Sequence, residues 1–371
     1  MHINVINSNL LRKSHDTNSY SALQNSHNTN NSFLSGKSHD TNSYSVSQTV
    51  LQNSQNKKPK TDLSGVALPI EKAEYMHRIG YRFVGAHSAI KICEWTRDCI
   101  RGTGVCYKKK FYGIETNRCI QMSPAVQFCD FNCMHCWRSL NYTMPPEDFQ
   151  WNDPEFILNG CVEEQKKILQ GFWGSEDAKK DMLEKAMEPN QVAISLSGEP
   201  TLYPRLSEFI DKILARKMTA FLVTNGAHPD AVKKLLDHQP TNLYVTLPAP
   251  NRELFMKECC PMANVKTSWE KILETLSLLK EFRTRTVIRL TLNKKHNLCK
   301  PEEYAKILEN TQSAFIECKG YMAIGGAREK IGPEFMASHK EIKEFAEQLE
   351  KLTSYKIKDE KEDSRVVLLA K

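Results

Sequence analysis

The chain has 371 residues, of which 40% are hydrophobic and 26% charged, and its formal net charge is +7. That length suits one large α/β domain or two ordinary ones, and the hydrophobic content indicates a real core. The sequence has no run of eighteen apolar residues and no signal-peptide core, so we expect a cytoplasmic protein without membrane contact. The basic surplus suits a polyanionic partner such as nucleic acid, although solvated lysines on helix faces explain it equally well.

Residues 1–60 are rich in Asn, Ser, Gln and Thr and contain few large apolar side chains. Such a segment cannot bury enough apolar surface to offset the entropy lost on ordering, so we expect a disordered, low-complexity tail. The sequence of residues 13–21 recurs at residues 37–45. Two copies are too few for a repeat architecture.

From about residue 61, apolar β-rich runs alternate with amphipathic helical segments. We expect six strands, at residues 125–128, 192–196, 220–223, 243–246, 287–292 and 314–318. Helices are expected at residues 154–170, 204–216, 229–236, 268–279 and 301–309, several of them opened by proline. A covering helix at residues 338–352 and a short strand at residues 365–370 complete the chain.

Strands that alternate with helices form parallel βα units, and six units predict a partial (β/α)6, TIM-like barrel in an α/β fold. We assign residues 124–371 to this barrel with its C-terminal helix, and residues 61–123 to an N-terminal extension. An open doubly wound sheet is the alternative, but it would have a G-x-G-x-x-G turn after its first strand, and none is present.

Cys129, Cys133 and Cys136 have the spacing C-x3-C-x2-C directly after the first predicted strand. Three thiolates on one loop can hold three irons of a 4Fe–4S cluster and leave the fourth iron open for a small chelating molecule. Structural zinc is the alternative, although it usually takes four ligands in two pairs. The absence of export signals favours reduced thiols and bound metal over disulfides.

Two further motifs follow the second and third predicted strands. Gly198-Glu199-Pro200 would allow close backbone approach to a ligand, and Glu199 could accept a hydrogen bond from an amino group there. Thr224 and Asn225 could bind a ribose or a methionine group. Each motif alone is typical of a plain turn, and its value lies in its place at a strand end beside the cysteine loop.

A second set of cysteines lies upstream. Cys93, Cys106 and Cys119 are thirteen residues apart and are flanked by basic residues, which favours a second cluster over three buried thiols. Lys108 belongs to a basic and aromatic run, residues 107–112, that could also contact phosphates and bases.

The chain resembles radical S-adenosylmethionine (SAM) enzymes, since Cys129, Cys133 and Cys136 match the cluster motif and Gly198-Glu199-Pro200 the second-strand motif. The resemblance implies a radical SAM barrel with a 4Fe–4S cluster whose open iron is chelated by SAM. It departs from the usual pattern at His135, where a larger aromatic residue commonly packs on adenine. An imidazole can still stack there.

Further motifs narrow the resemblance to the tRNA 4-demethylwyosine synthases, across roughly residues 65–350. They lie at residues 112–114, 118–122, 136–138, 196–204, 289–292 and 319–322. Eukaryotic members carry an N-terminal flavodoxin-like domain that this sequence lacks. It therefore resembles the archaeal form, and we expect a separate electron donor of the flavodoxin or ferredoxin type.

The resemblance implies a carbon–carbon lyase that joins N1-methylguanosine at position 37 of phenylalanine tRNA to two carbons of pyruvate. The product is the tricyclic base 4-demethylwyosine, an intermediate in wybutosine biosynthesis. It further implies that Cys93, Cys106 and Cys119 hold a second 4Fe–4S cluster that can chelate pyruvate. Lys108 matches a lysine proposed to form a Schiff base with pyruvate. We expect a monomer.

Two alternatives remain open from sequence: another radical SAM enzyme, either an RNA-modifying enzyme or an activase, and a zinc-binding nucleic-acid module. The first would share the C-x3-C-x2-C loop but lack the upstream cysteines with Lys108. The second would need no SAM. Candidate contacts to tRNA phosphates are the basic residues in or near the motifs: Lys109, Lys110, Arg138, Lys319 and Arg328.

Overall fold

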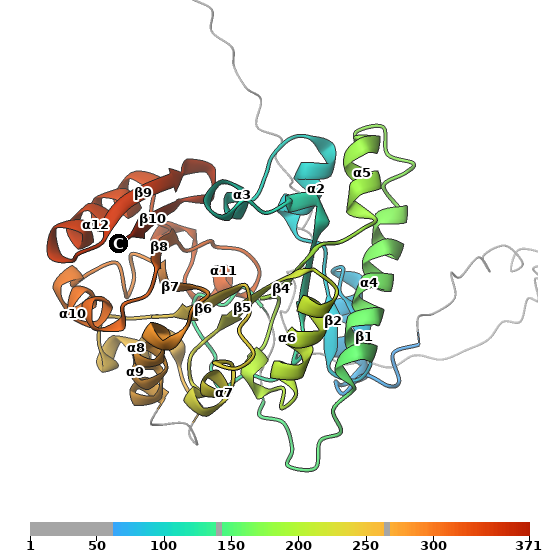
Figure 1. Ribbon diagram of the computed structural model, residues 1–371, viewed down its shortest axis with the longest axis horizontal. Coiled ribbons are helices and arrows are strands. Elements are labelled where there is room, and N and C mark those ends of the chain that lie inside the picture. Colours follow the sequence, from blue (N-terminus) through green and yellow to red (C-terminus); the bar gives the residue numbers. More distant parts are fainter. Residues whose placement is uncertain (1–61, 139–142, 263–267) are drawn as a thin grey trace, which may run out of the picture. The chain divides into compact units, whose positions relative to one another are not determined.

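Ten strands in one sheet organise the part of the chain that this computed structural model describes, residues 62–138, 143–262 and 268–371 (Figure 1). The strand order is β1-β2-β3-β4-β5-β6-β7-β8-β10-β9, and the strands from β3 to β8 are parallel. The two edge strands, β1 and β9, do not pair with each other, so the sheet is open. The predicted partial barrel is confirmed, whereas the predicted tail lies outside the described residues.

The parallel strands are close to those predicted, with one exception. Their bounds are β3 (Cys119–Ser123), β4 (Gln191–Ile194), β5 (Thr219–Thr224), β6 (Asn242–Thr246), β7 (Arg285–Leu292) and β8 (Phe315–Gly320). The antiparallel strands at the two edges are β1 (Arg82–Val84), β2 (Ser88–Ile90), β9 (Lys356–Lys361) and β10 (Val366–Ala370).

The prediction of a first strand at residues 125–128 is wrong. The first parallel strand is instead β3, and it ends before Pro124, which has no N–H to donate to the ladder. Ala125, Val126 and Phe128 are buried apolar residues of a loop, and Phe128 O accepts a hydrogen bond from Glu199 N. Burial alone therefore produced a strand-like pattern.

Six helices correspond to the predicted ones: α4 (Pro154–Gln170), α6 (Leu206–Ala215), α7 (Pro229–Lys234), α9 (Ser268–Leu278), α10 (Pro301–Thr311) and α12 (His339–Leu352). Their ends follow local chemistry. Asp153 caps α4 ahead of a first-turn proline, and Ser338 with Glu341 forms a capping box on α12.

The described helices that were not predicted are α1 (Ile70–Arg78), α2 (Glu94–Arg101), α3 (Tyr107–Tyr112), α5 (Lys180–Ala186), α8 (Arg252–Cys259) and α11 (Gly326–Lys330). Most are short and polar, so they give little periodic signal. None of the helices in the described ranges combines the length and hydrophobicity needed to cross a bilayer.

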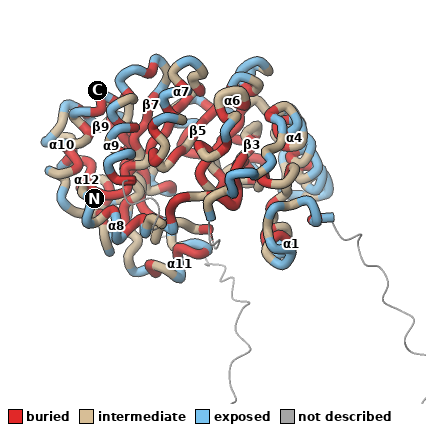
Figure 2. The backbone as a smooth tube through the Cα atoms, turned by 90° about the horizontal axis from the view of Figure 1, so that it is seen from below, coloured by how far each residue is buried: buried red, intermediate tan, exposed pale blue. Residues whose placement is uncertain are grey.

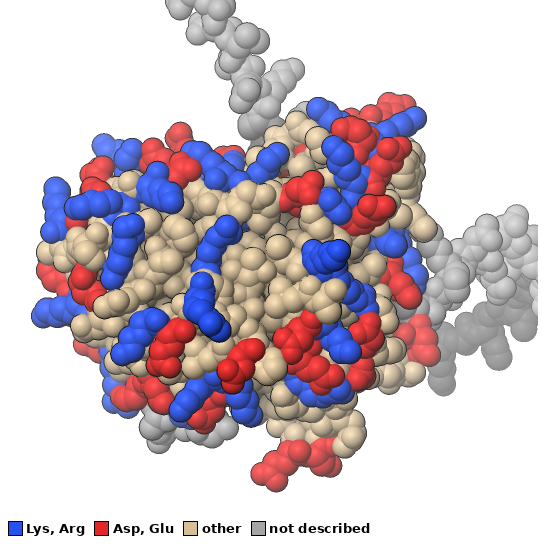
Figure 3. All heavy atoms as spheres, in the orientation of Figure 1, with Lys and Arg blue, Asp and Glu red and all other residues tan. Residues whose placement is uncertain are grey.

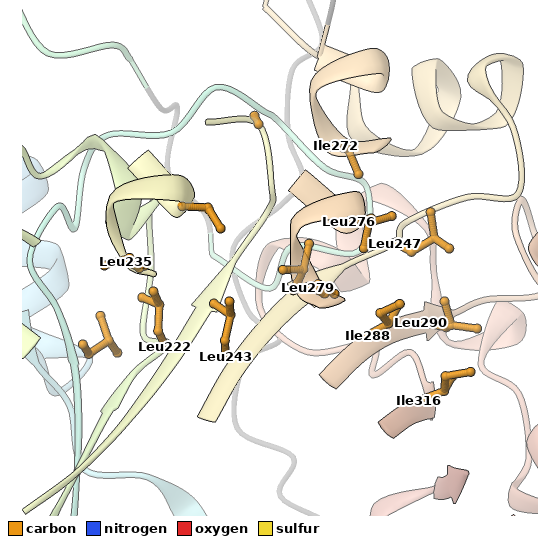
Figure 4. Close-up of a cluster of buried hydrophobic side chains, with 14 of the residues drawn as sticks. Leu222, Leu235, Leu243, Leu247, Ile272, Leu276, Leu279, Ile288, Leu290 and Ile316 are labelled. Carbon is orange, nitrogen blue, oxygen red and sulfur yellow. The ribbon is translucent and has the colours of Figure 1, made fainter. Parts of the chain in front are cut away.

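The main core lies between the outer face of the parallel strands and the helices that cover it (Figure 4). Leu222, Leu243, Ile288 and Ile316 project from successive strands and pack with helix residues such as Ile272. Side chains alternate along a strand, so the neighbouring residues face the concave, inner side of the sheet. Figure 2 shows the strands as mostly buried and the exposed residues on the outer helices.

Part of the N-terminal extension covers the inner face. Ile114 packs with Phe221, Tyr244 and Val287, and Tyr112 lies against this cluster. The end of α3 and the residues that follow it therefore lie on the concave side of the barrel, whereas Ile100 of α2 packs with Leu169 of α4 and Leu183 of α5. Because β1, β2 and β3 belong to the same sheet as the later strands, the division at residue 124 stays an interpretation of the sequence.

His87 connects the turn between β1 and β2 to the end of β3. It is fully buried; its Nε2 accepts from Asn152 N at 2.8 Å, and its Nδ1 lies 2.5 Å from Pro124 O. Nε2 must therefore be the acceptor and Nδ1 the donor, which is a neutral imidazole. Burial lowers the pKa of His87 to about 4.

The folded chain should lose stability in acid because of His87. Above pH 6.5 the ring is neutral in both states, but between pH 6.5 and 4 the unfolded chain binds a proton that the folded chain does not. At pH 5 the unfolding free energy should be about 2 kcal/mol lower than at neutral pH because of this residue. Urea unfolding of the cluster-free chain and of His87→Gln measures it. Parallel pH dependences in the two proteins would contradict this assignment.

Candidate active site

The C-x3-C-x2-C loop lies beyond the carboxyl end of β3, and its thiols are close together. Cys129 interacts electrostatically with Cys133, and Cys133 with Cys136. A hydrogen bond with Cys259 and burial raise the pKa of Cys133, and burial raises that of Cys129, well above the ordinary range. Buried thiols of this kind ionise when a positive metal centre compensates the charge. The donor set therefore fits an iron–sulfur group.

The C-terminal end of α8 holds this loop through backbone hydrogen bonds. Met134 N donates to Glu258 O at 2.7 Å, Asn132 N to Cys259 O at 3.1 Å, and Met262 N to Asp130 O at 3.0 Å. Cys260 follows the helix with a left-handed φ of 43° and allows the chain to turn beside the loop. The cysteine loop is thus fixed along one edge by main-chain contacts.

His135 is oriented by a buried carboxylate. Its Nδ1 lies 2.7 Å from Glu258 Oε1, while Glu258 Oε2 accepts from His296 Nδ1 at 2.8 Å and from Asn293 Nδ2 at 3.1 Å. Burial alone would raise the pKa of Glu258, but these donors hold it below its usual range. The ring that replaces the usual aromatic residue is therefore held in one orientation, and its contact with adenine stays a prediction.

Glu199 joins the ends of β4 and β5. Its Oε1 accepts from the hydroxyls of Thr201 and Thr224, both at 2.6 Å, and its Oε2 accepts from Asn225 N at 2.8 Å. Burial raises the pKa of Glu199 against the lowering effect of these donors. Glu199 also interacts electrostatically with Cys129. Glu199 therefore connects the ends of β4 and β5 to the cysteine loop, since its backbone N also donates to Phe128 O.

Gly198 has to be glycine at this place. Its φ is +69°, and a Cβ atom would lie 1.9 Å from Ala125 O, so any side chain would collide with the loop that follows β3. Asn225 Nδ2 lies 3.4 Å from Asp130 Oδ2 and 4.0 Å from Cys129 Sγ. The predicted SAM-binding residues therefore surround the cysteine loop, while their contacts with SAM remain predictions.

The second set of cysteines comes together at the opposite end of β3. Cys93 and Cys106 are the N-cap residues of α2 and α3, and Cys119 is the first residue of β3. The thiol of Cys119 interacts electrostatically with Cys93, Cys106 and Lys108. Burial raises the pKa of Cys106 to about 11 and that of Cys119 to about 12, and Lys108 opposes both shifts.

These three thiols also fit an iron–sulfur group. Helix N-termini and a neighbouring lysine favour the thiolate form, which is the form that binds metal. Across the described ranges, no three His, Cys, Asp or Glu side chains converge closely enough for a single metal ion. The fit rests on the chemistry of the three donors.

Cationic side chains gather on the inner face beside this second set. Lys108 is buried, with Nζ 5.2 Å from the Phe221 ring centroid and 5.1 Å from that of Tyr244. Arg289 pairs with Glu317, and burial lowers the pKa of Lys319 to about 8. Three cations with one carboxylate favour anionic groups at this place.

The predicted tRNA contacts are only partly on the surface. Arg138 is buried, which contradicts a phosphate contact at this residue. Lys319 is half-buried and its Nζ donates to Ser364 O at 2.7 Å, so its contact with tRNA stays a prediction. Lys109 and Arg328 are exposed, and exposed Lys110 pairs with Asp359. A motif does not reveal which side of a strand a lysine occupies. Basic and acidic side chains are interspersed on the face in Figure 3.

Sequence reasoning missed several titratable residues that support the site: the buried Asp130, Glu258 and Glu317, and the half-buried His228. Glu317 gave the clearest signal, since it is a lone acidic residue inside an apolar strand. His228 Nε2 lies 2.9 Å from Asp130 Oδ2 beside the cysteine loop. Their partners lie far away in sequence, which is why spacing did not reveal them.

The partial barrel with a three-cysteine loop after its first parallel strand defines a radical SAM protein. In agreement, a model of the radical SAM superfamily matches residues 124–308, and a model for wyosine base formation matches residues 310–371. The chain belongs to the family of S-adenosyl-L-methionine-dependent tRNA 4-demethylwyosine synthases. This membership confirms the resemblance and favours it over the zinc-binding alternative.

Two archaeal relatives and one solved structure illustrate the similarity. The synthase of Pyrococcus abyssi is 41% identical, covering 81% of this chain and 89% of the relative. The synthase of Methanocaldococcus jannaschii is 39% identical, covering 81% and 96%. A structure of TYW1 with a lysine-pyruvate adduct bound is 37% identical, with a TM-score of 0.74, and covers 82% of this chain and 96% of that one.

Glu258 should be required to keep the first cluster loop in place. In Glu258→Ala, His135, His296 and Asn293 lose their shared acceptor, and a buried donor left without a partner costs about 1–3 kcal/mol. The variant should unfold at lower urea and retain less iron after anaerobic reconstitution. Glu253→Ala, on the exposed side of the same helix, is the control. Equal iron content in both variants would show that the loop does not depend on Glu258.

Proposed function

We propose that this chain produces 4-demethylwyosine from N1-methylguanosine at position 37 of phenylalanine tRNA and two carbons of pyruvate. The reaction would belong to wybutosine biosynthesis in the cytoplasm. The observation that supports this most is the gathering of Cys93, Cys106 and Cys119 around Lys108, whose amine lies on the inner face of a radical SAM barrel. The alternative radical SAM enzymes would share the C-x3-C-x2-C loop but not this group.

Cys129, Cys133 and Cys136 would hold the cluster that binds SAM. When bound, the cluster and SAM supply the radical that starts the reaction on the methylated base. The chain's own part is to hold the loop rigidly. Glu199 ties the loop to two strand ends and Glu258 ties it to α8, so the reacting groups are positioned before the substrate arrives.

Cys93, Cys106 and Cys119 would hold a second 4Fe–4S cluster beside Lys108. Each of the three thiols interacts electrostatically with Lys108, which opposes the pKa increase caused by burial. Ligands from two helix N-termini and a strand start are fixed by backbone rather than by flexible side chains. Such ligands suit a cluster that presents a substrate in a constant position.

Lys108 would form a Schiff base with pyruvate. Nζ attacks the keto carbon, a C=N bond replaces the C=O bond, and the keto oxygen leaves as water with two protons from the amine. The rings of Phe221 and Tyr244 restrict the direction in which the amine can point. The solved relative with a lysine-pyruvate adduct supports this role by analogy.

The tRNA would present its modified base by extruding it from the anticodon loop, because the base must reach the inner face of the barrel. Exposed Lys109 and Arg328 are candidates for phosphate contacts, and binding through them should weaken with salt. We further propose a monomer reduced by a separate flavodoxin- or ferredoxin-type donor.

The reconstituted chain should convert methylated tRNA to the tricyclic nucleoside when SAM, pyruvate and a reductant are supplied. Mass analysis of digested tRNA detects the product, and iron analysis should give about eight irons per chain. Cys119→Ser should lower iron to about four and abolish product, because only the first cluster remains.

Cys99→Ser is the control, since this cysteine is buried in α2, close in sequence to Cys93, but lies outside the predicted ligand set. It should keep about eight irons and full activity. About four irons in the unmodified chain would contradict the second cluster. Eight irons without product would instead contradict the proposed reaction.

Lys108→Arg should abolish covalent capture of pyruvate while leaving both clusters in place, since arginine keeps the charge but is not a nucleophilic amine. Borohydride added to the chain with labelled pyruvate reduces the C=N bond, and peptide mass analysis locates the label. Lys109→Arg is the neighbouring exposed control. Persistent labelling in Lys108→Arg would point to another amine, with the half-buried Lys319 near Cys106 as the next candidate.

A further inference from the structure

Arg289 lies on β7 on the inner face of the barrel, and a buried carboxylate fixes its guanidinium. Nε and Nη2 donate to Glu317 Oε2 at 3.1 and 2.6 Å, and Nη2 also lies 2.5 Å from the Tyr107 hydroxyl. A planar guanidinium held by two of its nitrogens cannot rotate freely. Its remaining edge therefore points in one constant direction.

Glu317 is fully occupied by its own donors. The hydroxyls of Tyr112 and Tyr244 donate to Oε1 at 2.7 and 3.1 Å, and the Tyr107 hydroxyl lies 3.3 Å from Oε2. The carboxylate is completely buried. It needs no ligand, and it leaves the outer edge of Arg289 available.

The third nitrogen of Arg289, Nη1, makes no hydrogen bond within the described part of the chain, and the side chain keeps 16% of its surface exposed. The guanidinium carbon lies 4.7 Å from the centroid of the Tyr244 ring. Lys108 Nζ lies 5.1 Å from the same centroid. The amine and the guanidinium therefore contact the same aromatic ring, and both interact electrostatically with Glu317.

The other cations of this region are already engaged or differently placed. Lys319 Nζ donates to Ser364 O at 2.7 Å, and Arg285, four residues before Arg289 on β7, is exposed at the strand start. A partly desolvated guanidinium edge beside a reactive amine is suited to a carboxylate next to a carbonyl. Pyruvate has that arrangement of groups.

We propose that Arg289 binds the carboxylate of the keto acid that Lys108 captures, and so selects an α-keto acid over neutral carbonyl compounds. The inference rests on the proposed function and deepens it. The carboxylate carbon is bonded directly to the carbon that Lys108 attacks, so one rigid cation can anchor the acid while the amine reacts. Arg289 makes no covalent bond in this step.

The test measures borohydride trapping of Lys108 in the reconstituted chain. Trapping is measured once with pyruvate and once with its neutral methyl ester, and SAM is left out of both experiments. In Arg289→Lys, one ammonium must serve either Glu317 or the substrate. The pyruvate concentration that gives half-maximal trapping should rise roughly 10- to 100-fold, which is the range expected for a lost charge-assisted hydrogen bond. Half-saturation by the ester should not change. A purely structural defect would affect both compounds equally.

Arg285→Lys is the matched control on the same strand and should preserve the preference for pyruvate. If Arg289→Lys does not fold, Cys119→Ser provides a second measurement. A preference for pyruvate over its methyl ester that persists in this variant, without the second cluster, supports Arg289. A preference lost in Cys119→Ser, or unchanged in folded Arg289→Lys, would overturn the inference and assign the carboxylate to the cluster. If the unmodified chain traps neither compound, the proposed role of Lys108 fails as well, which is a distinguishable result.

Discussion

The attachment of α3 to the inner face of the barrel through Glu317 is the interaction on which the site depends most. Tyr107 and Tyr112 stand at the two ends of this short helix, and both donate to the same carboxylate on β8. Lys108 and Cys106 lie at the start of α3, so their position follows from this attachment. A six-residue helix is too short to be stable alone. Tertiary contacts with the barrel must therefore define it.

The first cysteine loop is organised in the same physical way. Glu199 and Glu258 are buried carboxylates, and each is surrounded by donors from segments that are distant in sequence. Burying such groups gives little net stability, but breaking one arrangement leaves an uncompensated charge that costs about 3–5 kcal/mol. These residues therefore specify one loop position rather than make the fold more stable. A single defined loop position matters more for the reaction, which needs its groups held in place, than for the stability of the fold.

The sequence was sufficient to predict those features that depend on residues close together in the chain. Helix α4 and helix α12 were predictable because Asp153 and Ser338 supply caps, and the C-x3-C-x2-C loop because its spacing is itself the signal. The strand predicted at residues 125–128 was wrong because an apolar run reports burial, not ladder pairing. The Arg289–Glu317 pair could not be predicted, since register across β7 and β8 brings the two residues together.

The two cysteine sets lie at opposite ends of the same strand, and this arrangement constrains the proposed reaction. Cys119 begins β3, and the loop with Cys129 follows its carboxyl end, so roughly 15 Å of extended chain separates them. The methylated base would have to lie on the inner face between them, with its methyl group toward the first set and its exocyclic amine toward Lys108. A carboxylate anchor at Arg289 would keep the keto acid from leaving while the larger tRNA substrate enters, because the acid is held by β7 and not by the tRNA.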